Sequence, residues 1–167
     1  EEFRQITPFS WNQCQGMIRD GKLVAEASQP GQAFTGNYYT GDVIVRTDIT
    51  VLEGEGKEVA VRAQGAERFY SLGFGRAGEV RICCHDYGCR VLKSVPFAWK
   101  YNTLYELEAV CKGETLTLLI DGEEVVSAKD GTHPWGMVGY SQEAGRFSSG
   151  RMRVTAEKSR GMERIHL

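Results

Sequence analysis

Short runs of Val, Ile, Leu and aromatic residues alternate with Gly-containing turns along most of the chain, and the helical period is nearly absent. The runs recur about every 8–12 residues, a spacing typical of a β-sandwich or β-barrel. Residues 42–52 show the alternation of a half-buried strand most clearly. One face carries Val43, Val45, Thr47, Ile49 and Val51; the other carries Asp42, Arg46, Asp48 and Thr50, with Ile44 as an exception.

Tight turns between these runs predict antiparallel hairpins. Asp20-Gly21 and Asp121-Gly122 both fit turns whose central residues need φ > 0. About fourteen short strands are expected, which is more than one open sheet usually holds, so two packed sheets are predicted. Residues 1–156 then form a single β-sandwich domain, and residues 157–167, with little apolar content, form a C-terminal tail. The expected strands lie within 17–26 (a hairpin), 42–52, 58–64, 68–75, 79–84, 87–93, 104–111, 115–120, 123–128, 135–140 and 147–155.

Composition narrows the function classes. The net charge of −2 lacks the basic excess of nucleic-acid binders, so no nucleic-acid partner is predicted. No apolar run approaches the roughly 20 residues that span a bilayer, so no membrane partner is predicted either. The five cysteines are an odd number, and adjacent Cys83 and Cys84 would point to opposite faces of a strand. We therefore expect reduced thiols in a cytoplasmic protein, with a secreted protein as the alternative. Because the chain opens on Glu1 without Met, we expect a processed product or a piece of a longer protein.

Three segments resemble concanavalin-A-like and laminin-G-like domains: 105–126 (YELEAVCKGETLTLLIDGEEVV), 135–140 (WGMVGY) and 61–72 (VRAQGAERFYSL). The third is similar to levan-binding-type carbohydrate modules and to jelly-roll domains appended to ADP-ribosylglycohydrolase-like and keto-disaccharide hydrolase-like proteins. The likeness covers residues 31–155. It implies an all-β, two-sheet antiparallel sandwich of the jelly-roll kind. Laminin-G-like relatives often hold calcium with carboxylates near strand ends, where this chain has Ser148, Ser149 and Arg151, and this puts a calcium site in doubt.

Few residues suggest catalysis or metal binding. The Glu-x-Asp-x-x-Glu triplet of concanavalin-like glucanases is absent, and Glu106 with Glu108 is the one carboxylate pair, which is also consistent with a solvated strand edge. The densest group of metal-ligand types lacks the second ligand pair of a zinc site and is interpreted as core thiols and a turn. No catalytic residue, metal or cofactor is therefore predicted. That group consists of Cys83, Cys84, His85, Asp86 and Cys89.

Aromatic and guanidinium side chains suggest ligand binding, because sugar rings stack on Trp and Tyr while their hydroxyls bond polar side chains. If the polar faces of neighbouring strands coincide, several Arg side chains and a Tyr share one surface; the alternative is that exterior Arg only keeps the sheet soluble. Arg62 is expected outside the core, with a role in binding and little in folding. Trp135 is expected to pack in the core. The predicted ligand-binding residues are Arg62, Gln64, Arg68, Tyr70, Arg81 and Trp99.

The function predicted is a non-catalytic carbohydrate-binding module that recognises a sugar or an ADP-ribose-like ligand on a polar and aromatic sheet face. A partner N-terminal catalytic domain in a parent protein is also expected. Two alternatives stay open: a glycoside hydrolase, or the accessory domain of an ADP-ribosylglycohydrolase-type hydrolase; and a structural or protein-interaction domain.

Overall fold

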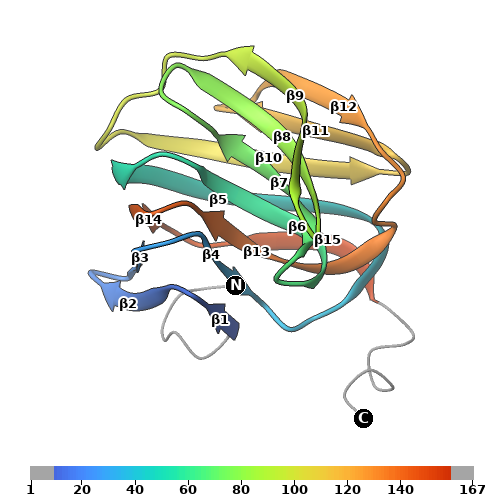
Figure 1. The fold of residues 1–167 in the computed structure, drawn as a ribbon, viewed down its shortest axis with the longest axis horizontal. Helices are drawn as coiled ribbons and strands as arrows, with labels where there is room; N and C mark the ends of the chain where they lie inside the picture. Colours follow the sequence, from blue (N-terminus) through green and yellow to red (C-terminus); the bar gives the residue numbers. More distant parts are fainter. Residues whose placement is uncertain (1–9, 159–167) are drawn as a thin grey trace.

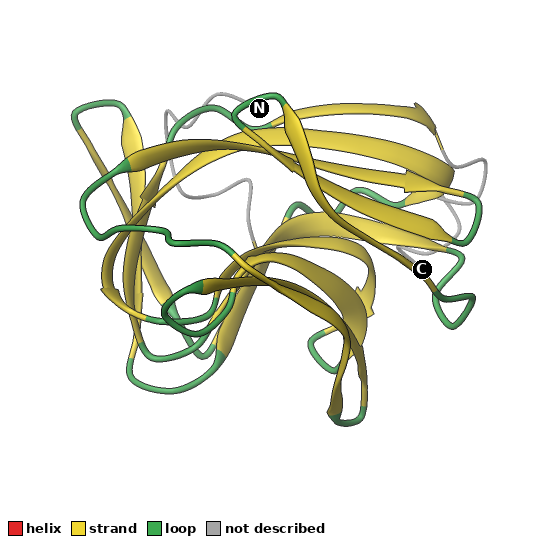
Figure 2. Ribbon diagram, turned by 90° about the horizontal axis from the view of Figure 1, so that it is seen from above, coloured by secondary structure: helices red, strands yellow, loops and turns green. Residues whose placement is uncertain are grey.

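Fifteen β-strands and no helix make up residues 10–158, the part of the chain that the computed structural model describes (Figure 1). The strands form two layers with connecting loops at both ends (Figure 2). In the described part, no helix is available to cross a membrane. The all-β sandwich expected from the alternating runs is confirmed, because each sheet buries one face against the other.

The first layer, sheet A, is antiparallel and has the strand order β1-β4-β13-β6-β7-β8-β9. Its strands are β1 (Ser10–Asn12), β4 (Gly31–Phe34), β13 (Trp135–Gln142), β6 (Lys57–Gly65), β7 (Arg68–Phe74), β8 (Glu79–Asp86) and β9 (Cys89–Pro96).

The second layer, sheet B, has the order β12-β11-β10-β5-β14-β3-β2, and β15 pairs with the first half of β5 beside β14. A short pairing of β13 with β5 joins the two sheets at one corner. The strands are β2 (Gln15–Arg19), β3 (Lys22–Ala27), β5 (Tyr39–Gly54), β10 (Leu104–Lys112), β11 (Thr115–Ile120), β12 (Glu123–Lys129), β14 (Gly145–Ser149) and β15 (Arg153–Lys158).

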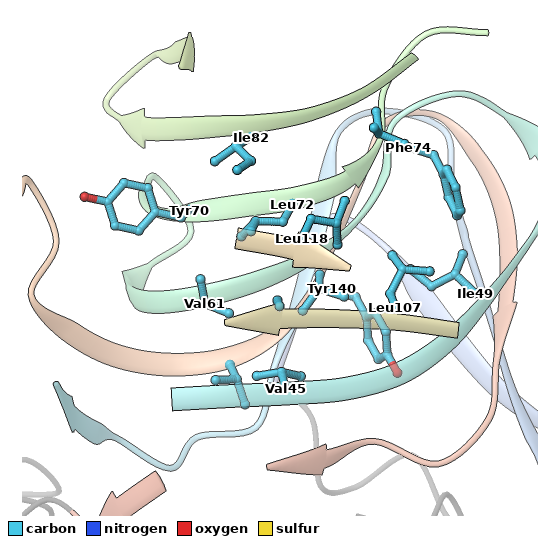
Figure 3. Packing of buried hydrophobic residues seen from close by; sticks show 14 of the residues in the cluster. Val45, Ile49, Val61, Tyr70, Leu72, Phe74, Ile82, Leu107, Leu118 and Tyr140 are labelled. Atoms are coloured by element: carbon cyan, nitrogen blue, oxygen red, sulfur yellow. The ribbon is translucent and has the colours of Figure 1, made fainter. Parts of the chain in front are cut away.

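The core lies between the sheets and follows the predicted alternation (Figure 3). Val43, Val45, Ile49 and Val51 of β5 are buried in it, as the pattern of residues 42–52 predicted. Thr47 is buried on the same face, where its hydroxyl lies 2.6 Å from the Tyr140 hydroxyl. A polar residue is tolerated there because it has a hydrogen-bond partner.

The predicted hairpin turns are confirmed: Asp20 and Gly21 have φ of 53° and 74°, and Asp121 and Gly122 have φ of 51° and 84°. One predicted strand is wrong in its extent. Residues 147–155 form the end of β14 and the first half of β15, with a break over residues 150–152. A Cβ at Gly150 would lie 2.3 Å from an Asp48 carboxylate oxygen.

Candidate functional site

The six predicted ligand-binding residues do not share one surface. Arg68 and Tyr70 are on the side of β7 that faces sheet B, whereas Arg81 is on the outer side of β8. In the β7–β8 register Arg81 stands opposite Gly73, five residues from Arg68, which corresponds to about 16 Å along the strand. The convergence of these guanidiniums expected from the sequence is therefore wrong. The alternation of one strand does not reveal which face of the next strand it matches.

Arg62 is buried with 3% of its surface exposed, so the expectation that it lies outside the core is wrong. The alternation of β6 breaks at this residue: Arg62 has φ of 49°, and the β6–β7 pairing shifts register between Val61 and Gly65. Such a bulge re-aims a side chain. Here the side chain turns towards the loops at one end of the sandwich.

Three separate segments of the chain accept hydrogen bonds from the Arg62 guanidinium. Nη1 donates to the carbonyl oxygen of Gly113 at 2.6 Å and to that of His133 at 3.4 Å. Nε and Nη2 donate to the carbonyl oxygen of Gly41 at 3.3 and 3.1 Å. Asp42 lies 3.9 Å from Nη2, and its carboxylate also accepts the Gly113 N–H at 2.8 Å. Arg62 thus ties together the start of β5, the β10–β11 turn and the loop before β13.

Tyr70 fixes the last of these loops from the core side. Its hydroxyl donates to the Asp130 carboxylate at 2.6 Å and accepts the His133 N–H at 3.0 Å. Burial alone would raise the pKa of Asp130, but hydrogen bonds from Thr132 and Tyr70, together with the charge of Arg90, lower this pKa to about 2. The Asp130 carboxylate is therefore charged across the physiological pH range and accepts the hydrogen bonds that hold this loop in place. Tyr70 is fully buried, so it shapes this end of the molecule without being exposed on it.

A hollow of about 190 Å³ lies where these loops meet. The buried Arg62 and His133 form part of its wall, and the exposed Asp42 and Glu114 bring two carboxylates to it. Gly131 lies close to Glu114, since a Cβ at this position would be 2.6 Å from a Glu114 carboxylate oxygen. The hollow is lined by Gly41, Asp42, Arg62, Gly113, Glu114, Gly131, His133 and Pro134.

An aromatic pair lies close to the hollow, with Trp135 exposed and Tyr38 partly buried, because Trp135 directly follows Pro134 of the lining. Trp135, next to Pro134 in the chain, has 39% of its surface exposed, so its expected packing in the core is wrong. Its ring centroid lies 5.7 Å from that of Tyr38, with the planes inclined by 52°. Gln64 belongs to the same end, since its amide donates to the Trp135 carbonyl oxygen at 3.3 Å. We name this assembly of hollow, Trp135, Tyr38 and Gln64 the loop-end site.

The remaining predicted residues lie elsewhere or have protein partners. Arg68, at the same end of the sandwich, is within 3.3 Å of Asp86. Arg81 donates to the buried carboxylate of Glu58 at 2.8 and 3.1 Å, and burial raises the pKa of that carboxyl. Trp99 is only 7% exposed and donates its indole N–H to the Arg76 carbonyl oxygen at 3.0 Å. Trp99 packs in the core and is not available as a stacking surface.

The cysteines and the groups weighed for metal binding occupy separate places. Cys83 and Cys84 are buried on opposite sides of β8, as predicted, with Cys84 in the core between the sheets. All five cysteines are unpaired. Between residues 10 and 158, no group of three or more His, Cys, Asp or Glu side chains could hold a metal ion.

Sequence reasoning did not place Asp42, Glu114, Tyr38 and Trp135 together at this end of the sandwich. Turn composition could have pointed to the first two, since Gly41-Asp42 and Gly113-Glu114 both place an acidic residue at a strand end. No comparable sequence pattern indicated that Tyr38 and Trp135 lie next to each other. Tyr38 and Trp135 are 97 residues apart in the chain, and only the corner pairing of β13 with β5 brings them together.

Comparison with known proteins shows the fold of the chain. No protein-family model matches it, and no curated protein matches it in sequence. Among solved structures it is similar to the carbohydrate-binding module CBM66 from Bacillus subtilis, with a TM-score of 0.82 and 14% identity over 89% of this chain and 96% of that one. A protein of unknown function with a galectin-like fold from Bacillus subtilis gives a TM-score of 0.74 at 12% identity, covering 93% and 92% of the two chains.

A third similar structure is the exoplasmic/lumenal domain of VIP36 in a Ca²⁺- and Man3GlcNAc-bound form. It has a TM-score of 0.66 at 11% identity, over 97% of this chain and 90% of that one. The chain thus has the concanavalin-A-like jelly-roll fold. Its structural neighbours include a carbohydrate-binding module and a domain whose structure is a Man3GlcNAc-bound form. At these identities the likeness establishes the architecture, and the function has to be argued from the site.

Proposed function

We propose that this chain is a non-catalytic carbohydrate-binding module and that its ligand binds at the loop-end site. The observation that carries the proposal is the exposed Trp135 beside a hollow that contains two carboxylates. An aromatic face next to hydrogen-bonding groups is the combination that a sugar ring requires, since the ring has apolar faces and polar edges.

In the proposed complex, one sugar face packs on the indole of Trp135, and Tyr38 supports that ring from the side. The carboxylates of Asp42 and Glu114 accept hydrogen bonds from sugar hydroxyls, and such charge-assisted bonds are stronger than neutral ones. The side chain of Gln64, whose N–H already bonds the Trp135 carbonyl oxygen, offers its amide oxygen as a further acceptor. No covalent step is involved.

Preorganisation is the role proposed for Arg62 and Tyr70. Their hydrogen bonds hold the start of β5, the β10–β11 turn and the loop before β13 in one arrangement before the ligand arrives. Binding to a preformed site avoids the entropy cost of ordering loops. Arg62 and Tyr70 were both predicted to bind the ligand directly. In this proposal they support binding by holding the binding surface in place, without contacting the sugar.

We further propose that the domain accompanies a catalytic domain in a longer protein. A structure with the name "Sialidase" supports this: the chain matches 17% of that protein at a TM-score of 0.64 and 8% identity, so the fold occurs there as one part of a larger chain. The ADP-ribose-like ligand remains one of the compounds to be screened.

The test is a glycan array followed by calorimetric titration of the sugars that bind. We expect Trp135→Ala to weaken binding at least tenfold, because buried aromatic contacts are frequent hot spots. Tyr101→Ala is the matched control, since Tyr101 is also exposed but lies next to Trp99 at the opposite end of the sandwich. Equal losses in both variants, or no saccharide bound across the array, would refute the proposal.

A further inference from the structure

The outer face of sheet B carries a second hollow, separate from the loop-end site. Its volume is about 380 Å³, within the range of small-ligand sites. Strands β5, β10 and β15 form its floor, and the residues that enclose it are mostly charged. They are Arg46, Thr47, Asp48, Glu106, Leu107, Glu108, Gly122, Arg151 and Arg153.

Strand register arranges these charges in two rows across the sheet. In the first row Glu108 of β10, Arg46 of β5 and Arg153 of β15 are direct cross-strand neighbours. In the second row Glu106 stands directly opposite Asp48. The half with the first row therefore carries two guanidinium groups and one carboxylate. The half with the second row is acidic in its two strand residues; Arg151, next to Gly150 in the chain, also lines the hollow and has an interaction of its own.

Arg46 and Arg153 are two like charges directly opposite each other. Side chains in such cross-strand pairs have Cβ atoms about 4.5–5.5 Å apart, and like charges in this position destabilise a sheet. Glu108 compensates only part of this repulsion, because it accepts from Nε of Arg46 at 2.6 Å. Among the side chains that the structure describes, none bonds the two terminal nitrogens of that guanidinium. Arg153 forms no ion pair with any of the side chains that the structure describes.

The carboxylates of the hollow differ in whether they already have a hydrogen-bond or ion-pair partner within the protein. Asp48 accepts the N–H of Gly150 at 2.8 Å, and Glu108 is held by Arg46. Glu106 is exposed, and its side chain has no ion-pair partner among the described residues. The acidic half thus keeps acceptor oxygens that face the hollow.

We propose that this hollow binds an acidic saccharide, a sugar unit that carries a carboxylate. The anionic group binds between Arg46 and Arg153, where guanidinium forks match the geometry of a carboxylate and where the anion removes the like-charge repulsion. Hydroxyls on the other edge of the ring donate to Glu106 and Asp48. A simple inorganic anion satisfies only the first half, and a neutral sugar satisfies only the second.

This second site does not depend on the proposed function of the loop-end site. The chain as a whole has a net charge of −2, so general attraction does not draw anions to it. Binding of an acidic sugar therefore requires the local arrangement of charges, and it weakens as salt concentration rises, because the contacts are exposed.

The experiment uses digalacturonate and its methyl ester, which has nearly the same shape without the charge. Calorimetric titrations at low ionic strength should detect binding of digalacturonate and at least tenfold weaker binding of the ester. Arg153→Gln and Arg46→Gln should each weaken digalacturonate binding about tenfold or more. The matched control is Arg19→Gln, which removes one exposed positive charge at the β2–β3 turn.

Several results would overturn the proposal. These are absence of digalacturonate binding at millimolar concentrations, equal binding of acid and ester, and equal losses in the Arg19 and Arg153 variants. Trp135→Ala separates the two sites. It should leave digalacturonate binding unchanged, and a loss in this variant together with normal binding in Arg153→Gln would place the acid at the loop-end site instead.

Discussion

The guanidinium of Arg62 and the carbonyl oxygen of Gly113 are joined by a 2.6 Å hydrogen bond between residues 51 positions apart in the chain. This contact connects the bulge in β6 to the β10–β11 turn. Strand alternation alone predicts Arg62 on the exposed surface of the sheet. In the folded protein Arg62 is buried and connects these segments.

Arg62→Ala should therefore destabilise the protein. The substitution removes the donor that bonds carbonyl oxygens in three segments and opens the space that the side chain fills, so we expect a loss of about 2–3 kcal/mol in the free energy of unfolding. Denaturant titration measures it. The exposed Arg19→Ala should change stability by less than about 0.5 kcal/mol. A neutral effect of Arg62→Ala would contradict its role as a connector.

Tyr70→Phe removes one hydroxyl from the buried core. The His133 N–H then loses its acceptor and the Asp130 carboxylate loses a donor, which should cost about 1–3 kcal/mol of stability. The pKa of Asp130 should also rise from about 2, because Tyr70 is one of the groups that lower it. Chemical denaturation and an NMR titration of the Asp130 carboxyl would measure the two effects. An unchanged Asp130 pKa would argue against this hydrogen bond.

Gly139→Ala should disrupt the contact between β13 and β4. A Cβ at Gly139 would lie 1.8 Å from the carbonyl oxygen of Ala33, which belongs to backbone and cannot rotate away. Separating paired strands to relieve the clash should cost about 3 kcal/mol or more. Gly65→Ala is the control, since nothing lies within 4 Å of its added methyl group. Thermal melts of both variants should differ clearly, and equal melting temperatures would be inconsistent with the observed packing.

His85 should make stability depend on pH. Burial, with the charges of Arg81 and His133 adding to it, lowers the pKa of His85 from its usual 6.5 to about 4. Between these values the unfolded chain binds a proton that the folded chain does not bind, so stability falls as pH decreases from 6.5 to 4 and this contribution levels off below 4.

The His85→Gln variant serves as the reference. It lacks the titrating ring but keeps a group able to bond the Ser71 hydroxyl, which lies 2.9 Å from His85 Nε2. Urea titrations from pH 7 to pH 4 should show a shallower decline for this variant than for the parent. The raised pKa of Glu58 acts in the opposite direction in both proteins and cancels in the comparison. Parallel curves would show that His85 is not responsible.

The sequence by itself determined the two-sheet architecture, most strand positions and the turns. Those features depend on local patterns: alternation in residues 42–52 selects a core face, and Asp-Gly pairs at 20–21 and 121–122 supply residues that accept positive φ. Both effects act between residues close together in the chain, and a single sequence records them directly.

Only the tertiary structure decided the candidate sites. A bulge at Arg62 reversed the orientation that strict alternation assigned to it, and such a register shift depends on the partner strand. Trp135 meets Tyr38, and Arg46 meets Arg153, through pairings between strands about 100 residues apart. Each proposed binding surface is formed by residues that are far apart in the chain and become neighbours only in the folded protein. The alternation of residues indicates which face of its own strand a side chain occupies. The register between paired strands, which is set only in the folded protein, decides which side chains lie next to it.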